Sequence, residues 1–333
     1  MRLACVIAAA LLLPGCSTAD TSQEAEAAGG EGIGTGGDNG AGSTGGAVST
    51  APQDGETDGI DTQAGSDGLS DDGSDDEPPA DDTGDPGTGG RRDVWTPAPG
   101  TTWQWQLTET VDTSLDVEVY DIDLFDVTAD VIETLHNDGR TVICYFSAGS
   151  YEEWRLDAAL FPREALGNPL DGWPGERWLD HRNPTVRQIM EARLDLAVTK
   201  QCDAVEPDNV DGYANDHGAG ISADDQLDYN GWLATQAHAR GLSIGLKNDV
   251  DQLEALADAF DWALNEECVQ YEECGGLEAA FIDQGKAVFH VEYVDDLADG
   301  EGLAELICGN ANQLGFSTLV KEWDLGVWGI PCW

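Results

Sequence analysis

Residues 183–208 read NPTVRQIMEARLDLAVTKQCDAVEPD, and they contain one helix followed by one strand. The pair Asn183-Pro184 is a typical helix cap and first helical residue. The short run that begins at Ala204 is β-rich, and it ends in the carboxylates Glu206 and Asp208. This stretch therefore predicts a helix that leads into a strand with an acidic end, and the rest of the chain can be compared with this pattern.

The same alternation of strands and helices extends from Trp95 to the C-terminus. The sequence predicts eight short strands, at residues 102–107, 117–123, 141–146, 204–206, 243–246, 262–264, 287–291 and 318–321. Amphipathic segments with recognisable ends predict helices at residues 128–138, 183–200, 222–240 and 302–314. Strands that each lead into a crossover form a parallel sheet, and eight of them favour an α/β fold of the (β/α)₈ TIM-barrel type. No Gly-x-Gly-x-x-Gly follows the first strand, which disfavours an open dinucleotide-binding sheet.

The aromatic residues show where the folded part of the chain begins. All eleven Trp, seven Tyr and seven Phe lie at or after Trp95. Without bulky apolar side chains, residues 16–93 cannot form a core, and their Gly, Asp and Ser content predicts a disordered acidic linker. Residues 94–333 are then a single domain of barrel size.

The N-terminus predicts export. Residues 3–13 form an apolar run that is too short to span a bilayer but has the length of a signal-peptide core. The following Leu13-Pro14-Gly15-Cys16 resembles a bacterial lipobox, in which cleavage precedes a lipidated cysteine. We therefore expect a lipoprotein signal peptide at residues 1–15 and lipidation at Cys16; the alternative is an ordinary cleaved secretory signal. The mature protein would be anchored at the cell envelope, facing either the periplasm or the exterior, and would not span the membrane.

The charge of the chain excludes some partners. The formal net charge is −50, and residues 94–333 carry 46 Asp and Glu against 12 Lys and Arg. Such a field repels nucleic acid and anionic lipid headgroups, and it attracts cations or polycations. We therefore expect no nucleic-acid partner, contact with the membrane only through the lipid anchor, and a monomer. The alternative explanation of the charge is adaptation to salt or solubility.

Six cysteines lie in the predicted domain, and an even number in an exported protein is typical of disulfides. Proximity pairs Cys268 with Cys274, and position near the C-terminus pairs Cys308 with Cys332. Elimination leaves Cys144 with Cys202. The alternative is a zinc site, but the five His show no ligand spacing near these cysteines, so we predict no metal.

Acidic and aromatic residues follow most of the predicted strands. In a barrel these positions form the rim that carries the active site. Carboxylates gathered there repel one another unless they bind cations or perform acid–base chemistry. Aromatic rings stack on the apolar faces of sugars, so the combination favours carbohydrate, and a pair of carboxylates is what glycoside cleavage requires. No Gly-x-Ser-x-Gly elbow is present, which argues against a serine hydrolase.

Four sequence motifs at or near the ends of predicted strands carry a resemblance to a known family. They are Glu206-Pro-Asp-Asn-Val-Asp-Gly-Tyr213, Gly245-Leu-Lys-Asn248, Asn265-Glu-Glu-Cys-Val-Gln-Tyr271 and Gly285-Lys-Ala-Val-Phe-His-Val-Glu-Tyr293. With these motifs the chain resembles glycoside hydrolase family 114 over residues 94–294. The resemblance implies a TIM barrel that needs no cofactor and hydrolyses α-1,4-linked galactosamine polymers as an endo-α-1,4-polygalactosaminidase.

The resemblance also implies roles for individual residues. The catalytic pair falls on Asp208 and Glu266, although the adjacent Glu267 leaves open which glutamate faces the cleft. The positions expected to bind substrate are Asp121, Tyr145, Asp180, Asp211, Tyr213, Lys247, Asn248, Glu267, Glu292 and Tyr293. Two other functions remain as alternatives: a surface lipoprotein that binds polysaccharide without cleaving it, and a metal-dependent deacetylase or phosphoesterase.

The acidic charge predicts a salt dependence. De-N-acetylated galactosamine is an ammonium sugar near neutral pH, so long-range attraction should assist its binding. Affinity for the de-N-acetylated polymer should therefore fall as salt rises, because exposed charges more than about 8 Å apart are screened at physiological ionic strength. The measurement is equilibrium binding at low and high salt, with the neutral N-acetylated polymer as control. Equal affinity for the charged polymer at both salt concentrations would contradict the hypothesis.

Overall fold

The structure is a computed structural model that describes residues 94–333. The predicted signal peptide, the lipidation site Cys16 and the predicted linker lie outside the described residues. Within residues 94–333, no helix is long and apolar enough to cross a membrane.

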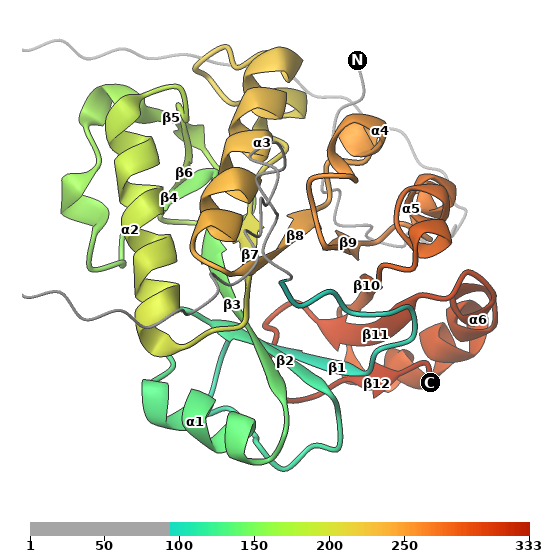
Figure 1. Ribbon diagram of the computed structural model, residues 1–333. Coiled ribbons are helices and arrows are strands. Elements are labelled where there is room, and N and C mark those ends of the chain that lie inside the picture. The colour runs from blue at the N-terminus through green and yellow to red at the C-terminus, as the bar shows by residue number, and fades with distance from the viewer. Residues whose placement is uncertain (1–93) are drawn as a thin grey trace, which may run out of the picture. The chain divides into compact units, whose positions relative to one another are not determined.

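Eight parallel strands form the centre of the domain (Figure 1). They are β1 (Trp103–Gln106), β2 (Val119–Asp123), β3 (Thr141–Ser147), β7 (Ala204–Asp208), β8 (Ser243–Lys247), β9 (Trp262–Glu266), β10 (Val288–Val294) and β11 (Ser317–Glu322). Neighbours in this order are hydrogen-bonded to one another in parallel. Each strand coincides with one of the eight predicted runs, so the (β/α)₈ prediction is confirmed.

β1 and β11 are the two ends of the parallel series, and they approach each other although no strand pairing joins them among residues 94–333. The indole N–H of Trp103 donates to the carbonyl of Ser317 at 2.9 Å, and the backbone N–H of Leu107 donates to the carbonyl of Leu325 at 2.9 Å. The main sheet also has a short ninth member, β12 (Ile330–Pro331), which pairs antiparallel with β11. The C-terminal segment therefore contributes to the region where β1 approaches β11, and the sequence did not indicate this role.

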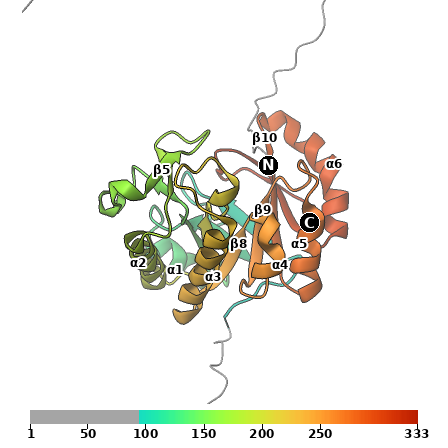
Figure 2. The same ribbon diagram turned by 90° about the horizontal axis from the view of Figure 1, so that it is seen from above.

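Helices lie outside the strands, as the two views in Figures 1 and 2 show. They are α1 (Ala129–Asn137), α2 (Pro184–Lys200), α3 (Ala223–Ala239), α4 (Leu253–Leu256), α5 (Cys274–Ala280) and α6 (Gly300–Gln313). The side chain of Asn183 caps α2 by accepting from the backbone of Thr185, and Ser222 and Asp225 form a capping box on α3. The four predicted helices are confirmed, whereas α4 and α5 are too short to give a clear periodic signal.

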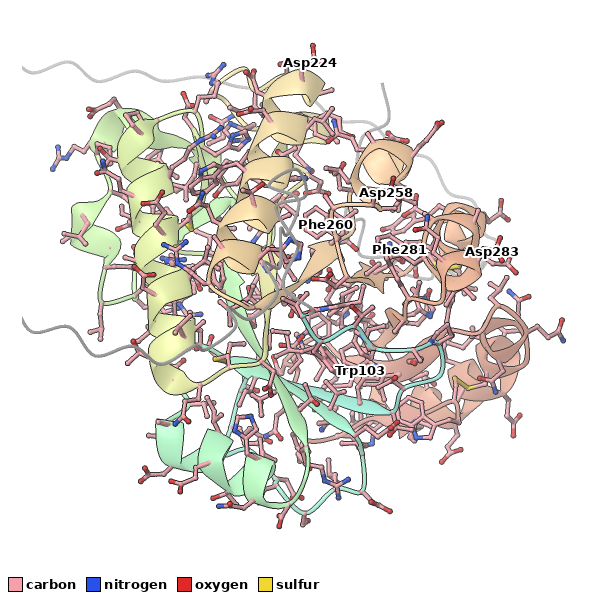
Figure 3. The ribbon with its side chains drawn as sticks, viewed as in Figure 1. Trp103, Asp224, Asp258, Phe260, Phe281 and Asp283 are labelled. Atoms are coloured by element: carbon pink, nitrogen blue, oxygen red, sulfur yellow. A yellow bond between two sulfur atoms is a disulfide. The ribbon has the colours of Figure 1, made fainter. Side chains whose placement is uncertain are left out.

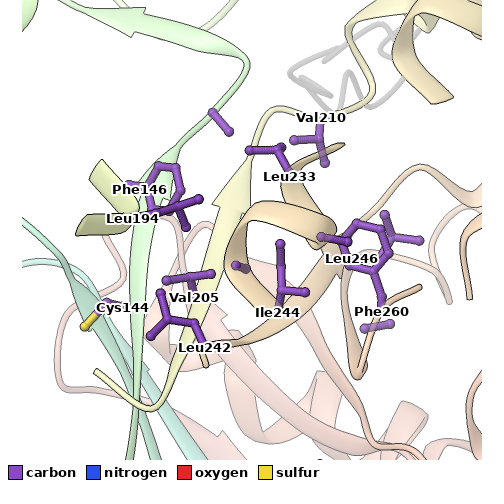
Figure 4. Close-up of a cluster of buried hydrophobic side chains, with 14 of the residues drawn as sticks. Cys144, Phe146, Leu194, Val205, Val210, Leu233, Leu242, Ile244, Leu246 and Phe260 are labelled. Atoms are coloured by element: carbon purple, nitrogen blue, oxygen red, sulfur yellow. The ribbon is translucent and has the colours of Figure 1, made fainter. Parts of the chain in front are cut away.

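The alternation of side chains along the strands creates two cores. One set points into the barrel, where Trp103, Trp262 and Phe289 pack together, and Figure 3 shows Trp103 among the central strands. The other set points towards the helices. Figure 4 shows this outer layer, in which Val205 and Ile244 of the sheet lie in the same cluster as residues of α2 and α3. The inner set continues into the rim of the barrel.

An insertion between β3 and α2 carries a second, smaller sheet. It contains three antiparallel strands, β4 (Ser150–Glu152), β5 (Leu166–Pro169) and β6 (Glu176–Leu179). None of them was predicted, because these segments are only three or four residues long and lack a run of β-branched residues. The insertion places its own polar residues beside the end of β3.

Three disulfides are present, and their pairing is the one that the sequence predicted. Cys144 of β3 is bonded to Cys202, Cys268 to Cys274, and Cys308 to Cys332. The sulfurs of Cys268 and Cys274 also lie within 4.8 Å of a ring nitrogen of His290. Since both sulfurs are in a disulfide, this trio has no thiolate to offer a metal.

Gly245 on β8 should tolerate no side chain. A Cβ at this position would lie 2.3 Å from the ring of Trp262, inside the barrel. Gly245→Ala should therefore destabilise the domain by about 1–3 kcal/mol through overpacking. The matched control is Gly231→Ala in the middle of α3, where a Cβ meets nothing within 4 Å and should stabilise by up to about 1 kcal/mol. Denaturant unfolding of both variants checks the prediction, and equal effects would contradict it.

Candidate active site

The ammonium group of Lys247 lies at the centre of the barrel rim. Its Nζ is 2.9 Å from Glu206 Oε1, 3.0 Å from Asp208 Oδ1 and 3.3 Å from Glu266 Oε2. Lys247 is almost completely buried, as is Glu206, whereas Asp208 and Glu266 keep 18% and 25% of their side-chain surface exposed. The lysine thus joins one buried carboxylate to two that face solvent.

This arrangement follows from strand alternation. Lys247 is the last residue of β8, Asp208 the last of β7 and Glu266 the last of β9. Because parallel strands end at the same edge of a sheet and these positions share the inward face, their side chains converge.

Aromatic and amide donors hold the two exposed carboxylates. Tyr145 of β3 donates its hydroxyl to Asp208 Oδ2 at 3.0 Å. Glu266 receives a hydrogen bond from the hydroxyl of Tyr293 on Oε1 and one from the side-chain amide of Asn248 at 3.0 Å on Oε2. Each carboxylate therefore has hydrogen-bond donors on both oxygens, which fixes its orientation.

Charge–charge interactions keep Lys247 protonated. Burial by itself would lower the pKa of Lys247, but Asp208, Glu206 and Glu266 together raise that pKa well above its ordinary value. The lysine also lies over the ring of Trp105, with its Nζ 4.7 Å from the ring centroid. The site is thus built around a permanent positive charge.

Beneath the lysine, Asp121 and Glu206 form a buried acid pair. Asp121 is fully buried, and neither of its oxygens has a hydrogen-bond donor among residues 94–333. Burial and the neighbouring Glu206 raise the pKa of Asp121 well above its ordinary value, while burial raises the pKa of Glu206 to about 7. Two carboxyl groups can form a hydrogen bond with each other only if one of them carries a proton, so the raised pKa values of both residues favour a proton shared within the pair.

The position of Asp208 depends on close packing against the loop after β3. The backbone N–H groups of Ala148 and Gly149 both donate to the carbonyl of Asp208, at 2.8 and 3.0 Å. A Cβ on Gly149 would lie 1.6 Å from the carbonyl oxygen of Asn209. Only glycine allows the two backbones to approach in this way.

A second cluster of acidic residues, Asp211 and Asp249, lies next to this rim. Asp211 is near enough to Asp208 and Glu266 for burial, together with their charges, to raise its pKa to about 6. Tyr213 donates to Asp249 Oδ1 at 3.1 Å, and burial raises the pKa of Asp249 to about 8. Both predicted residues, Asp211 and Tyr213, therefore belong to an extension of the site that also includes Asp249.

Three predicted residues lie differently from the rest. Glu292 is on the outward face of β10, where its Oε1 accepts from His290 and from the backbone N–H of Val269. Asp180 follows β6 and forms a two-point ion pair with Arg182. Glu267 is half-buried beside Glu266, and burial and the charge of Glu266 raise its pKa to about 7.

Glu206, Asp249 and Trp105 are not among the residues that the resemblance predicts for the site, although all three lie at or near the ends of predicted strands. Glu206 and Trp105 are connected by a hydrogen bond of 3.1 Å from the indole N–H to Glu206 Oε2. Period-two alternation from Asp208 would have placed Glu206 on the inward face. For Asp249 the only signal is its place just after a predicted strand, because it lies in an irregular turn after β8 with φ of 45°, where strand alternation no longer applies.

Replacement of Asp121 by asparagine should make the stability of the protein less sensitive to pH. A carboxyl group whose pKa is raised by folding stabilises the fold least at high pH, and stability is lost as pH rises above the ordinary value of 3.8. The amide introduced by Asp121→Asn would donate a hydrogen bond to Glu206 without titrating. The difference in thermal unfolding midpoint, Asp121→Asn minus wild type, should therefore grow between pH 4 and pH 8. Asp171→Asn, at an exposed position, serves as control, and a constant difference for Asp121→Asn would refute the explanation.

Comparisons with known proteins identify a family and two similar structures. A family model described as glycoside-hydrolase family GH114 matches residues 85–333. The crystal structure of Aspergillus fumigatus Ega3 in complex with galactosamine is similar to this chain, with 46% sequence identity, a TM-score of 0.67, and coverage of 72% of this chain and 97% of that chain. The comparison with curated proteins gives no match.

A more distant structure shares the fold. The glycoside hydrolase domain of PelA from Pseudomonas aeruginosa has 13% identity and a TM-score of 0.58, and the match covers 69% of this chain and 98% of that domain. With a family match over residues 85–333 and a close relative that spans the barrel, this chain belongs to glycoside hydrolase family 114 and is a glycoside hydrolase.

Proposed function

We propose that this enzyme cleaves internal bonds of α-1,4-linked galactosamine polymers, with Asp208 and Glu266 as its catalytic pair. The observation that carries the proposal is the bridge of Lys247, which holds these two partly exposed carboxylates side by side at the barrel rim. The related Ega3 was crystallised with galactosamine, which supports the choice of sugar.

The separation of the carboxylates favours a retaining reaction. Because Asp208 Oδ1 and Glu266 Oε2 contact the same Nζ at 3.0 and 3.3 Å, these two oxygens are at most about 6.3 Å apart, whereas inverting enzymes need roughly 6.5–9.5 Å between the carboxyl groups to fit a water. One carboxylate then attacks the anomeric carbon while the other protonates the departing oxygen. In the second step water displaces the enzyme carboxylate, and the former acid removes a proton from that water.

We assign Asp208 as the nucleophile and Glu266 as the acid–base residue. Tyr145, Asn209 and Lys247 all donate to Asp208, which fixes the orientation of this carboxylate for attack on the anomeric carbon. Glu266 is then the residue that protonates the departing oxygen, because a retaining pair consists of one nucleophile and one acid–base residue.

The charge of the site suits an ammonium sugar. Lys247 neutralises one of the carboxylates around it, and Asp211 adds a further acid close to Asp208 and Glu266. An uncompensated negative potential favours a cationic substrate and disfavours uronic acids. The remaining predicted sugar contacts, at Tyr145, Asn248 and Tyr293, hold the catalytic carboxylates as well.

The proposal includes export to the cell envelope as a lipoprotein anchored through Cys16. Its support is the set of three disulfides, which form and persist in oxidising compartments. A lipid-anchored enzyme of this kind would act on exopolysaccharide near the cell surface as a monomer.

Replacement of either catalytic carboxylate should abolish cleavage. Asp208→Asn and Glu266→Gln should each lower kcat on de-N-acetylated α-1,4-galactosamine oligomers by at least about 10²–10⁴-fold. The measurement is product release, with the anomeric configuration of the first products read by NMR; we expect the α anomer. The neighbouring Glu267→Gln is the matched control and should keep most of the activity.

A second substrate separates the two roles. An oligomer with a dinitrophenyl leaving group needs no protonation, so Glu266→Gln should regain formation of the glycosyl-enzyme on it, whereas Asp208→Asn should not. Loss of activity in Glu267→Gln equal to that in Glu266→Gln would move the acid role to Glu267. A first product with the β anomer would overturn the retaining mechanism.

A further inference from the structure

One exposed tryptophan is connected to the catalytic pair through a single ring. The rings of Tyr293 and Trp323 are stacked, with centroids 4.1 Å apart and an interplanar angle of 14°. The hydroxyl of the same Tyr293 donates to Glu266. Trp323 directly follows β11, so it lies at the same rim of the barrel as the active site.

The ring of Trp323 is fixed in place although it is exposed. Its indole N–H donates to Asp295 Oδ1 at 3.2 Å, and Tyr293 covers one of its faces. Even so, 40% of its surface remains exposed. An aromatic side chain held rigidly by neighbours and left open to solvent can stack on a ligand with little loss of conformational entropy.

We propose that Trp323 and Asp295 form a sugar subsite next to the point of cleavage, an inference that rests on the proposed function. A galactosamine unit has an apolar face of C–H groups, because its 4-hydroxyl is axial, and this face would stack on Trp323. The exposed carboxylate of Asp295 would contact the ammonium group of the same unit. The subsite therefore selects oligomers that extend beyond the cleaved bond and are de-N-acetylated there.

The position of the subsite follows from the contacts already described. Glu266 acts at the cleaved bond, Tyr293 touches Glu266, and Trp323 stacks on Tyr293. One aromatic ring thus separates the exposed indole from the catalytic residue, so the indole is in reach of a neighbouring sugar of the same chain.

The test uses the dependence of activity on oligomer length. In Trp323→Ala, the ratio of kcat/KM for long oligomers to kcat/KM for the shortest cleaved oligomer should fall by about 3–10-fold, the loss expected for one aromatic stacking contact. Trp323→Phe should restore most of the ratio, because the ring is kept. Thermal unfolding midpoints establish that each variant is folded.

Trp333 provides a matched control. It is 47% exposed and lines a cavity with Pro99, Gly315 and Ser317, at the opposite end of β11 from Trp323. Trp333→Ala should leave the length ratio unchanged. Asp295→Asn should lower kcat/KM on de-N-acetylated oligomers and leave that on N-acetylated oligomers as in the wild type, if the latter are cleaved.

The outcomes separate the subsite from the proposed function. Failure of the wild type to cleave any galactosamine oligomer would overturn the proposed substrate. Normal cleavage by the wild type, with the same length ratio in Trp323→Ala and Trp333→Ala, would overturn the subsite alone. An equal loss in Asp295→Asn on acetylated and de-N-acetylated oligomers would remove the role of its charge.

Discussion

The buried ammonium group of Lys247 is the constraint on which the active site depends. A charge at this depth is costly unless it is paired, and Lys247 contacts Glu206, Asp208 and Glu266 within 3.3 Å. Three carboxylates around one lysine leave excess negative charge, and burial together with Glu206 raises the pKa of the next acid, Asp121, well above its ordinary value. The positive charge of the lysine allows two carboxylates to remain side by side at the rim.

The need to compensate these carboxylates also explains why three aromatic residues of the barrel carry an O–H or N–H donor. Trp105 donates to Glu206, Tyr145 to Asp208 and Tyr293 to Glu266. Each ring fills space inside the barrel and also supplies a hydrogen bond to a carboxylate. A phenylalanine in place of Tyr293 would keep the ring but would leave Glu266 Oε1 without its hydrogen-bond donor. Packing and charge compensation are therefore carried out by the same side chains.

The sequence predicted the eight strands and their acidic rim because period two and strand ends are local signals. The family resemblance predicts both Glu292 and Tyr293 in the groove, although adjacent residues of a strand point to opposite faces and Glu292 lies on the outward one. The resemblance also predicts Asp180 there, and in the structure Asp180 forms an ion pair with Arg182, two residues along the chain. The raised pKa of Asp121 depends on burial and on Glu206, which is 85 positions away in the chain.

Backbone strain is concentrated where β7, β8 and β9 end. Asn209, Asn248 and Glu267 follow these strands directly, and all three have positive φ, at 60°, 48° and 61°. Asparagine adopts this conformation readily, but for glutamate it is unfavourable, at a cost of order 1–3 kcal/mol. The strained Glu267 is followed by Cys268, whose disulfide to Cys274 closes the loop, and by Val269, whose N–H donates to Glu292. Glu292 lies outside the barrel, and its hydrogen bond from Val269 stabilises this loop. The loop begins at the turn after Glu266, so Glu292 helps to keep the side chain of Glu266 in contact with Lys247.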